Sequence, residues 1–365
     1  GVENVDEFTV MPWDWTYHSE KVKNRHFKIN DEMTRPYFEL ERVRQGVFSL
    51  ATKLYGLTFR ENKKIPVYNE DVNAYEVFDR RGNYIAVLYT DFLQRPSKMS
   101  GAWMNSFQEQ YIDEEEKDHR PHVVIVMNFA RPTETRPSLL TYSEVETLLH
   151  EFGHGLHGML SKCMYESLSG TNVKPDFVEL PSQIMENWLK EKEFLDQFAV
   201  HYETGEKMPA YIVQKLVDAT NFNIGYKCCQ QVSFSLLDMA WHSITEPFDQ
   251  NFEAFEKEAW APSVVLPEVP NTLLSTSFGH VFSGGDYAAG YYGYKWAEVL
   301  EADAFAAFKE AGIFSKAVAT SFYDNILSKG DIDDPNRLYI RFRCQQPTIE
   351  ALLQRNGLAR NKIKR

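Results

Sequence analysis

The chain has 365 residues, of which 43% are hydrophobic and 14% aromatic, enough for the core of one large domain or two lobes. Its formal net charge of −13 repels phosphate backbones and no Lys/Arg stripe reverses it, so nucleic acid is not expected as a partner. The longest apolar runs stop far short of the roughly 20 residues that a membrane helix requires, and no membrane partner is expected.

Cysteine usage and the first residues bear on the compartment. The four cysteines lack paired metal-ligand spacing, and the adjacent Cys228 and Cys229 suit a disulfide framework poorly. We therefore expect reduced thiols and, by default, a cytoplasmic location. The sequence opens with GVENVDEF, without an initiator Met or the layout of a signal peptide, so we interpret its start as a cut point.

The hydrophobic periodicity changes along the chain. It predicts helices at 14–24 and 35–56, then strands at 74–79, 84–92 and 122–129, with a turn between the first two strands. Helical periodicity then returns in five stretches, at 143–162, 177–197, 209–245, 288–311 and 313–328. Without repeats or a long linker, we expect one continuous domain, mainly α with a small antiparallel β-sheet.

The stretch LLHEFGHGLHGML, residues 148–160, contains an HExxH motif. On a helix, His150 and His154 lie on one face and can share a metal ion, while Glu151 takes the position of the general base. The preceding TYSEVETL favours such a helix, with Ser143 as the expected N-cap. The competing interpretation is an amphipathic helix whose histidines belong to the core.

A hydrolytic zinc site needs a third protein ligand. Position 160 is Leu, which excludes the metzincin pattern. His157 lies on nearly the same face as His150 and is better placed to support the ligands than to join them. Downstream, Glu179 and Glu186 share a predicted helical face, so one could bind the metal while the other hydrogen-bonds a ligand histidine; both are also typical of a solvated face.

A second segment places hydrogen-bonding side chains next to glycines, which allow the backbone unusual conformations. HVFSGGDYAAGYYGY, residues 280–294, places one histidine and four tyrosines on a glycine-rich loop that runs into a predicted helix. Such a loop could supply donors to the negative oxygen that forms during acyl transfer. The alternative is an aromatic packing loop.

Together these motifs carry a resemblance to a known family. HEFGHGLH, SLSGTN and DFVELPSQIMENW follow one another, and the likeness extends to PWDWTYHSEK, RPSKMSGAWM, HVFSGGDYAAGYYGYKWAEVLEADAF and RFRCQQPTIEALLQRNGL. In this order they resemble the thimet oligopeptidase family of zinc peptidases, known as M3, and most of all its peptidyl-dipeptidase (dipeptidyl carboxypeptidase) branch. The resemblance implies a zincin-like (gluzincin) fold, one Zn²⁺ per chain and short peptides as substrates.

The resemblance also implies roles for individual residues. His150, His154 and Glu179 match the zinc ligands and Glu151 the catalytic base, while Glu186, with His157, is expected to support the ligands. In the loop, the match implies two catalytic residues: His280 contacts the substrate and Tyr294 donates to the oxyanion. It also implies that Tyr287 and Tyr291 bind the substrate.

Two departures from the family pattern qualify this match. Asp286 stands between Gly285 and Tyr287, which moves His280 one residue further from the tyrosines. Family members are also nearly twice as long, so we expect residues 1–365 to be the M3-type catalytic domain of a longer polypeptide, whose N-terminal half would be its partner.

The predicted function is zinc-dependent peptidase, releasing C-terminal dipeptides. The alternatives are an oligo-endopeptidase of the same family, a peptide-binding module that no longer catalyses, and a structural helical domain. Dipeptide release requires a cation or donors for the terminal carboxylate, and Arg341, Arg343 and Lys295 lie in or near the resembling segments.

Overall fold

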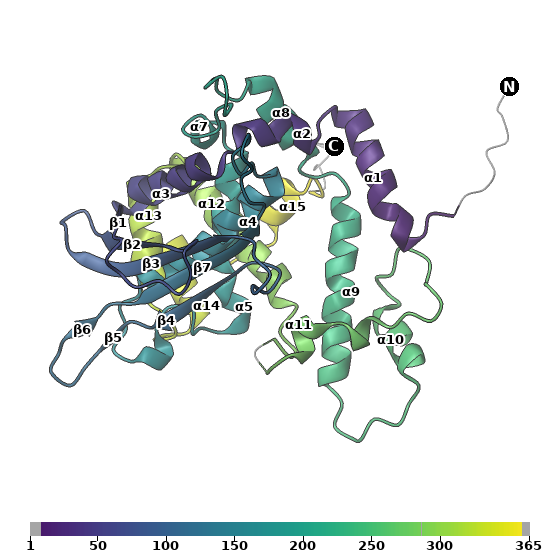
Figure 1. Ribbon diagram of the computed structural model, residues 1–365. Helices are drawn as coiled ribbons and strands as arrows, with labels where there is room; N and C mark the ends of the chain where they lie inside the picture. Colours follow the sequence, from purple (N-terminus) through teal and green to yellow (C-terminus); the bar gives the residue numbers. More distant parts are fainter. Residues whose placement is uncertain (1–8, 286, 360–365) are drawn as a thin grey trace, which may run out of the picture. The chain divides into compact units, whose positions relative to one another are not determined.

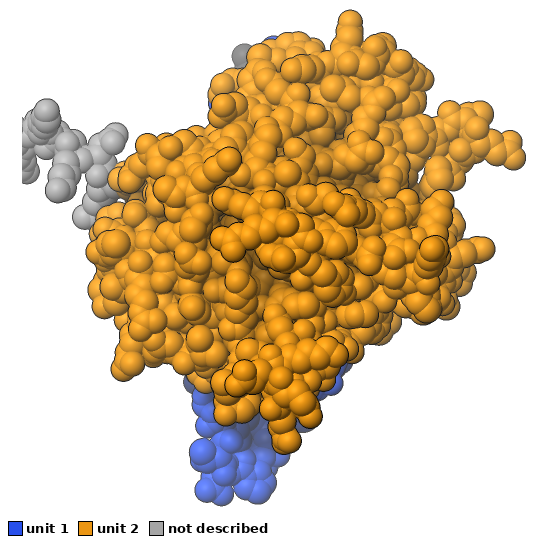
Figure 2. Space-filling model, turned by 90° about the vertical axis from the view of Figure 1, so that its left-hand side faces the viewer, with its two compact units in different colours: residues 1–29, 215–295 blue, residues 30–214, 296–365 orange. Residues whose placement is uncertain are grey.

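The structure, a computed structural model, describes residues 9–285 and 287–359. The chain forms two compact units, residues 1–29 with 215–295 (unit 1) and residues 30–214 with 296–365 (unit 2), coloured separately in Figure 2. Within the described residues, no helix is long and apolar enough to cross a membrane. The expected fold class, mainly helical with a small sheet, is confirmed (Figure 1), and β5 (Tyr111–Ile112) and β6 (Asp118–His119) form a second sheet of two strands.

Unit 2 contains the sheet and most of the helices. Its strands are β1 (Thr58–Glu61), β2 (Asn73–Phe78), β3 (Tyr84–Leu93), β4 (Trp103–Gln108), β5 (Tyr111–Ile112), β6 (Asp118–His119) and β7 (His122–Phe129). Its helices are α2 (Asp31–Thr34), α3 (Leu40–Tyr55), α4 (Tyr142–Met159), α5 (Pro175–Val178), α6 (Leu180–Glu186), α7 (Lys192–Leu195), α13 (Lys316–Phe322), α14 (Pro335–Arg343) and α15 (Glu350–Arg355).

Unit 1 is helical in the part of it that the structure describes. Its helices are α1 (Pro12–Phe27), α9 (Ile224–His242), α10 (Phe252–Trp260) and α11 (Gly279–Phe282). Two further helices cross the boundaries between the units along the chain, α8 (Ala210–Ala219) and α12 (Gly293–Ala311). The core of unit 1 includes Leu237 of α9 packed with Phe278 and Val281, so the segment before the glycine-rich loop is anchored on α9.

The five-stranded sheet has the order β1-β2-β3-β7-β4 and is mixed rather than antiparallel. Strands β1 and β4, which were not predicted, pair antiparallel with β2 and β7. Of the predicted strands, β2 and β3 are antiparallel as expected, but β3 and β7 are parallel. The prediction was wrong on this pair because residues 94–121 form a crossover that contains β4, and β7 enters the sheet between β3 and β4. Strand β4 is therefore an edge strand.

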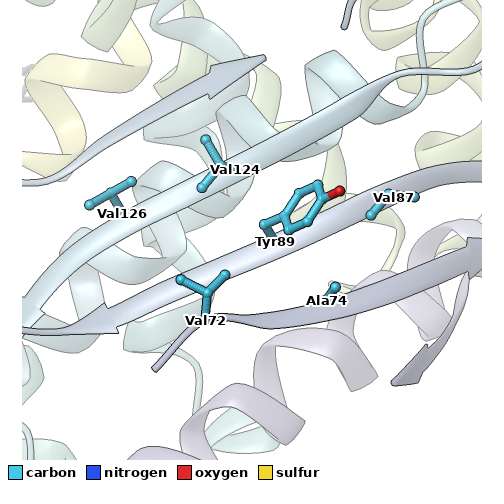
Figure 3. Close-up of a cluster of buried hydrophobic side chains, with 6 residues drawn as sticks. All are labelled: Val72, Ala74, Val87, Tyr89, Val124 and Val126. Atoms are coloured by element: carbon cyan, nitrogen blue, oxygen red, sulfur yellow. The ribbon is translucent and has the colours of Figure 1, made fainter. Parts of the chain in front are cut away.

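The two faces of this sheet are both covered with apolar side chains. On one face, residues of β2, β3 and β7 and the residue before β2 form a buried cluster, shown in Figure 3: Val72, Ala74, Val87, Tyr89, Val124 and Val126. On the other face, Gly155 and Gly158 of α4 approach Ile125 and Val123 of β7. Side chains alternate along a strand, so β7 supplies both clusters and holds α4 against the sheet.

Several predicted helices are shorter or broken in the structure. The stretch 177–197 is divided among α5, α6, a 3₁₀ turn at Asn187–Lys190 and α7. Pro181, in the first turn of α6, explains the break between α5 and α6. The stretch 209–245 is two helices, and Asn223, in the left-handed conformation, caps the second. The N-cap of α4 is Thr141, not Ser143: Thr141 and Glu144 bond each other's backbone N–H in a capping box.

Candidate active site

Helix α4 carries both histidines of the HExxH motif. Four residues apart, His150 and His154 lie on one face of the helix, with ring centroids 5.0 Å apart. Both imidazoles direct Nε2 toward the same atom, Oε2 of Glu179, at 3.2 Å in each case. The helix therefore presents a pair of nitrogen donors to one carboxylate oxygen.

Glu179 reaches the histidines because α6 lies very close to α4. It is the residue between α5 and α6, and the next turn of α6 packs against Gly153. A Cβ at position 153 would lie 2.2 Å from the backbone oxygen of Pro181, so only glycine allows this approach. Ser182 Oγ donates to Glu179 Oε2 at 2.7 Å and fixes the carboxylate further.

The donor set fits a metal ion. The three candidate ligand atoms all lie within 4.8 Å of one another, and among the described residues they form the one such group of His, Cys, Asp or Glu. Donors about 2.0–2.1 Å from a tetrahedral zinc ion are about 3.3–3.4 Å apart, close to the two spacings of 3.2 Å. The two histidines hold the pKa of Glu179 well below its usual range against the effect of burial, so this carboxylate is ionised.

Glu186, at the end of α6, holds the other nitrogen of His150. Its Oε1 lies 2.8 Å from His150 Nδ1. A carboxylate that accepts the Nδ1 proton keeps the ring in the tautomer whose Nε2 lone pair can bind a metal. Helical spacing left open which of Glu179 and Glu186 faces the histidine pair, whereas the family resemblance implied Glu179. In the structure Glu179 lies at Nε2 and Glu186 at Nδ1 of His150.

Glu151 is buried beside these groups, with 6% of its surface exposed. Burial raises the pKa of its carboxyl, while the two histidines and the backbone N–H of Met104 on β4 oppose the rise. A raised pKa makes a carboxylate a stronger base, which suits proton transfer near neutral pH. Glu151 thus bonds the edge strand and interacts electrostatically with both histidines.

His157 does not have the supporting role that we expected from its position on α4. It is fully buried, and neither ring nitrogen has a hydrogen-bond partner among the described residues. Burial, with a smaller effect of His154, lowers the pKa of His157 to about 3, so the ring is neutral. Its surroundings are those of a core side chain.

The remaining predicted residues form an aromatic group in unit 1. Tyr294, in the first turn of α12, has its hydroxyl 3.1 Å from His280 Nε2. The His280 ring packs on Tyr287 and Tyr291, with centroid distances of 4.5 and 5.4 Å. Tyr291 also packs on Phe278 of the unit 1 core, and burial raises its pKa. The structure thus brings His280 and the three tyrosines together, whereas Asp286 lies outside the described residues.

Asp238 of α9 anchors the loop that carries this group, and the sequence analysis did not select it. Its carboxylate is fully buried and accepts the backbone N–H groups of Ala289 and Tyr291, each at 2.9 Å. His242 Nδ1 lies 2.7 Å from the same carboxylate. The available signal was a lone aspartate within helix α9, but the loop residues that it bonds, Ala289 and Tyr291, lie 51 and 53 residues further along the chain.

Comparison with known proteins places the chain in a family. A profile of peptidase family M3 matches residues 2–358. A dipeptidyl carboxypeptidase of Escherichia coli (strain K12) is 41% identical over 354 residues, which are 96% of this chain and 51% of that protein. Oligopeptidase A of the same organism is 40% identical over 357 residues, 97% of this chain and 52% of that protein. The chain thus spans about half the length of these curated relatives.

Solved structures agree at the level of the fold. An M32 carboxypeptidase from Deinococcus radiodurans R1 matches with a TM-score of 0.53 at 15% identity, covering 90% of this chain and 61% of its own. With the family profile across almost the whole sequence and the paired histidines and glutamate assembled on α4 and α6, the chain belongs to peptidase family M3.

Proposed function

We propose that this chain carries the zinc-dependent catalytic centre of a peptidase that releases dipeptides from the C-terminus of short peptides. The observation that supports the proposal most is the convergence of His150, His154 and Glu179, with Glu151 buried beside them. Two imidazoles and one carboxylate form the ligand set of several hydrolytic zinc sites, which keep a further position for water.

In this proposal Glu151 moves the proton. A zinc ion held by His150, His154 and Glu179 would lower the pKa of water toward about 7 and polarise the scissile carbonyl. The Glu151 carboxylate accepts a proton from the attacking water and returns it to the leaving amine, and its burial strengthens it as a base. Glu186 keeps His150 oriented throughout.

We further propose that the aromatic group of unit 1 binds substrate and stabilises the transition state. Tyr294 donates its phenol proton toward the oxygen that becomes negative, and His280, 3.1 Å from that hydroxyl, orients it and contacts the substrate. Tyr287 and Tyr291 contact the peptide. These roles rest on the family resemblance and on the chemistry of the side chains.

The edge strand β4 offers a place for an extended peptide. Its outer side has no partner strand among the described residues, and Met104 contributes a backbone N–H to the surroundings of Glu151. An extended peptide can add to such an edge through main-chain hydrogen bonds. This arrangement supports a peptide substrate bound next to the proposed base.

The alternative is an oligo-endopeptidase, because identity to oligopeptidase A is 40% against 41% for the dipeptidyl carboxypeptidase. Two of the cations considered for the terminal carboxylate have carboxylate partners: Arg343 pairs with buried Asp303 and Arg341 with Asp333. Neither arginine favours dipeptide release.

We propose that the rest of an M3-length polypeptide is this chain's partner. From the cysteine usage of the chain we further propose that the protein is cytoplasmic.

One digestion separates the two modes. An N-blocked hexapeptide is offered as free acid and as C-terminal amide to the full-length polypeptide, with and without a chelator, and the products are identified by mass spectrometry. We expect release of the last two residues from the acid, a much lower rate on the amide, and no cleavage with chelator. Equal rates on both, with cuts at internal bonds, would favour the oligo-endopeptidase.

A variant tests the base independently. Glu151→Gln keeps the shape of the side chain but cannot accept the proton, so we expect turnover to fall about 100-fold or more while metal content stays unchanged. Turnover close to that of the wild type would exclude Glu151 as the base.

A further inference from the structure

A buried ion pair joins the last helix of the chain to α12. Arg355 of α15 contacts Glu301 of α12, whose side chain is 3% exposed. Both also bond Asn187: its Nδ2 donates to Glu301 Oε2 at 2.6 Å, and its Oδ1 accepts from Arg355 at 3.3 Å. Asn187 is 4% exposed, so the three side chains form a largely buried polar network.

Asn187 is also where this network meets helix α6. Its Nδ2 lies 3.3 Å from the backbone oxygen of Gln183 and 3.2 Å from that of Ile184, carbonyls in the last turn of α6. The preceding residue is Glu186, which holds His150 Nδ1. Burial raises the pKa of Glu301 to about 7, and the Glu186 carboxylate adds a smaller rise.

We propose that Asn187, Glu301 and Arg355 are positioning residues that fix the C-terminal end of α6 and thereby set the metal affinity of the site. This inference rests on the proposed zinc site. Helix α6 begins directly after Glu179 and ends at Glu186, so a shift at Asn187 moves both carboxylates relative to α4. Residues that support metal ligands typically change metal affinity by about 10–100-fold when they are lost.

The same helix supplies a matched control. Two residues after Glu301, Asp303 pairs with Arg343 of α14, and Tyr339 donates to the same carboxylate. The side chains of this pair are 5% and 14% exposed, comparable to the 3% and 25% of Glu301 and Arg355. Within the part of the chain that the structure describes, Asp303 and Arg343 bond each other, Tyr339 and Gln345, none of which belongs to α6. Loss of either pair therefore disturbs the C-terminal region, but loss of the first also releases α6.

The experiment compares zinc dissociation constants of the full-length polypeptide and its variants, measured by competition with a fluorescent chelator. We expect Arg355→Gln to raise the constant about 10–100-fold and Arg343→Gln to leave it within about threefold. Asn187→Ala, which keeps the Glu301–Arg355 pair intact, should raise the zinc dissociation constant about tenfold. If Arg355→Gln does not fold, the result for Asn187→Ala tests the positioning role.

The outcomes separate this inference from the proposed function. If the wild type binds zinc tightly and Arg355→Gln and Asn187→Ala bind it as tightly as Arg343→Gln does, the positioning role is refuted while the zinc site stands. Equal weakening in all three variants would also refute it, because general destabilisation would then explain the effect. A wild type that binds no zinc would refute the proposed function itself.

Discussion

Gly153 is the residue whose substitution tests the construction of the metal site most directly. In Gly153→Ala the new Cβ would lie 2.2 Å from the Pro181 oxygen and 2.6 Å from Ser182 Cα, both backbone atoms. Real Cβ contacts are essentially never under 3.0 Å, and ordinary ones begin at 3.4 Å. The Pro181 backbone of α6 must therefore move away from α4 by at least 0.8 Å, from 2.2 to 3.0 Å, and by 1.2 Å to reach an ordinary contact at 3.4 Å.

A displacement of α6 by 0.8 Å or more exceeds what the ligand geometry of a metal site tolerates. Ligand distances are held within about 0.2 Å of their ideal values, and functional constellations within about 0.5 Å. Glu179 moves with α6, so its oxygen would leave the position 3.2 Å from both Nε2 atoms. We expect the zinc dissociation constant to rise at least about 100-fold, the upper end of the effect of losing a supporting residue.

Stability should change less than metal binding in this variant. Overpacking costs about 1–3 kcal/mol, and replacing glycine by alanine inside a helix returns about 1 kcal/mol. The control is Gly155→Ala on the same helix, where the new Cβ would meet Ile125 Cδ1, the end of a flexible side chain, at 3.0 Å. Chelator competition on both variants, with thermal melting of the metal-free proteins, checks the reasoning. A Gly153→Ala protein that binds zinc as tightly as Gly155→Ala would refute it.

Four further substitutions address the other assignments. Glu179→Ala should remove stoichiometric zinc, whereas Glu186→Ala should retain it with an affinity about 10–100-fold lower; full zinc content in Glu179→Ala would contradict the ligand assignment. Tyr294→Phe should lower kcat about 100-fold or more with little change in KM, and a change in KM alone would point to simple substrate binding. Asp238→Asn weakens the anchoring of the loop, so we expect thermal melting to show a loss of about 1–3 kcal/mol of stability. Kinetics should show a lower kcat/KM at unchanged zinc affinity. Unchanged kcat/KM would mean that the loop does not depend on Asp238.

The sequence predicted the parts of this site that lie on one regular element. His150 and His154 could be placed on one helical face because the periodicity and spacing are local. The choice between Glu179 and Glu186 was not local, since it depends on how closely α6 approaches α4, and that distance is set by Gly153 against the Pro181 backbone. Spacing alone gave both glutamates the same face.

Long-range pairing explains the other differences. The β7 sequence predicted a strand with the bounds that the structure shows, but not its parallel partner β3, because strand order depends on the crossover that contains β4. Strand β4 itself was missed, since WMNSFQ is short and half-exposed. Ser143 was predicted as the N-cap of α4, whereas the cap is Thr141, which has the Thr-x-x-Glu spacing of a capping box.

Metal binding and turnover should respond differently to substitutions in this protein, because different parts of the structure hold the groups proposed for each. The zinc ligands depend on backbone packing between α4 and α6, where a displacement of less than 1 Å matters and no side chain can adjust. The aromatic group depends on a loop whose backbone is held by the charge of Asp238. Variants of the first part should therefore lose metal and activity together, while variants of the second should keep the metal and lose activity. A variant of Asp238 that lost zinc would show that the two parts are coupled.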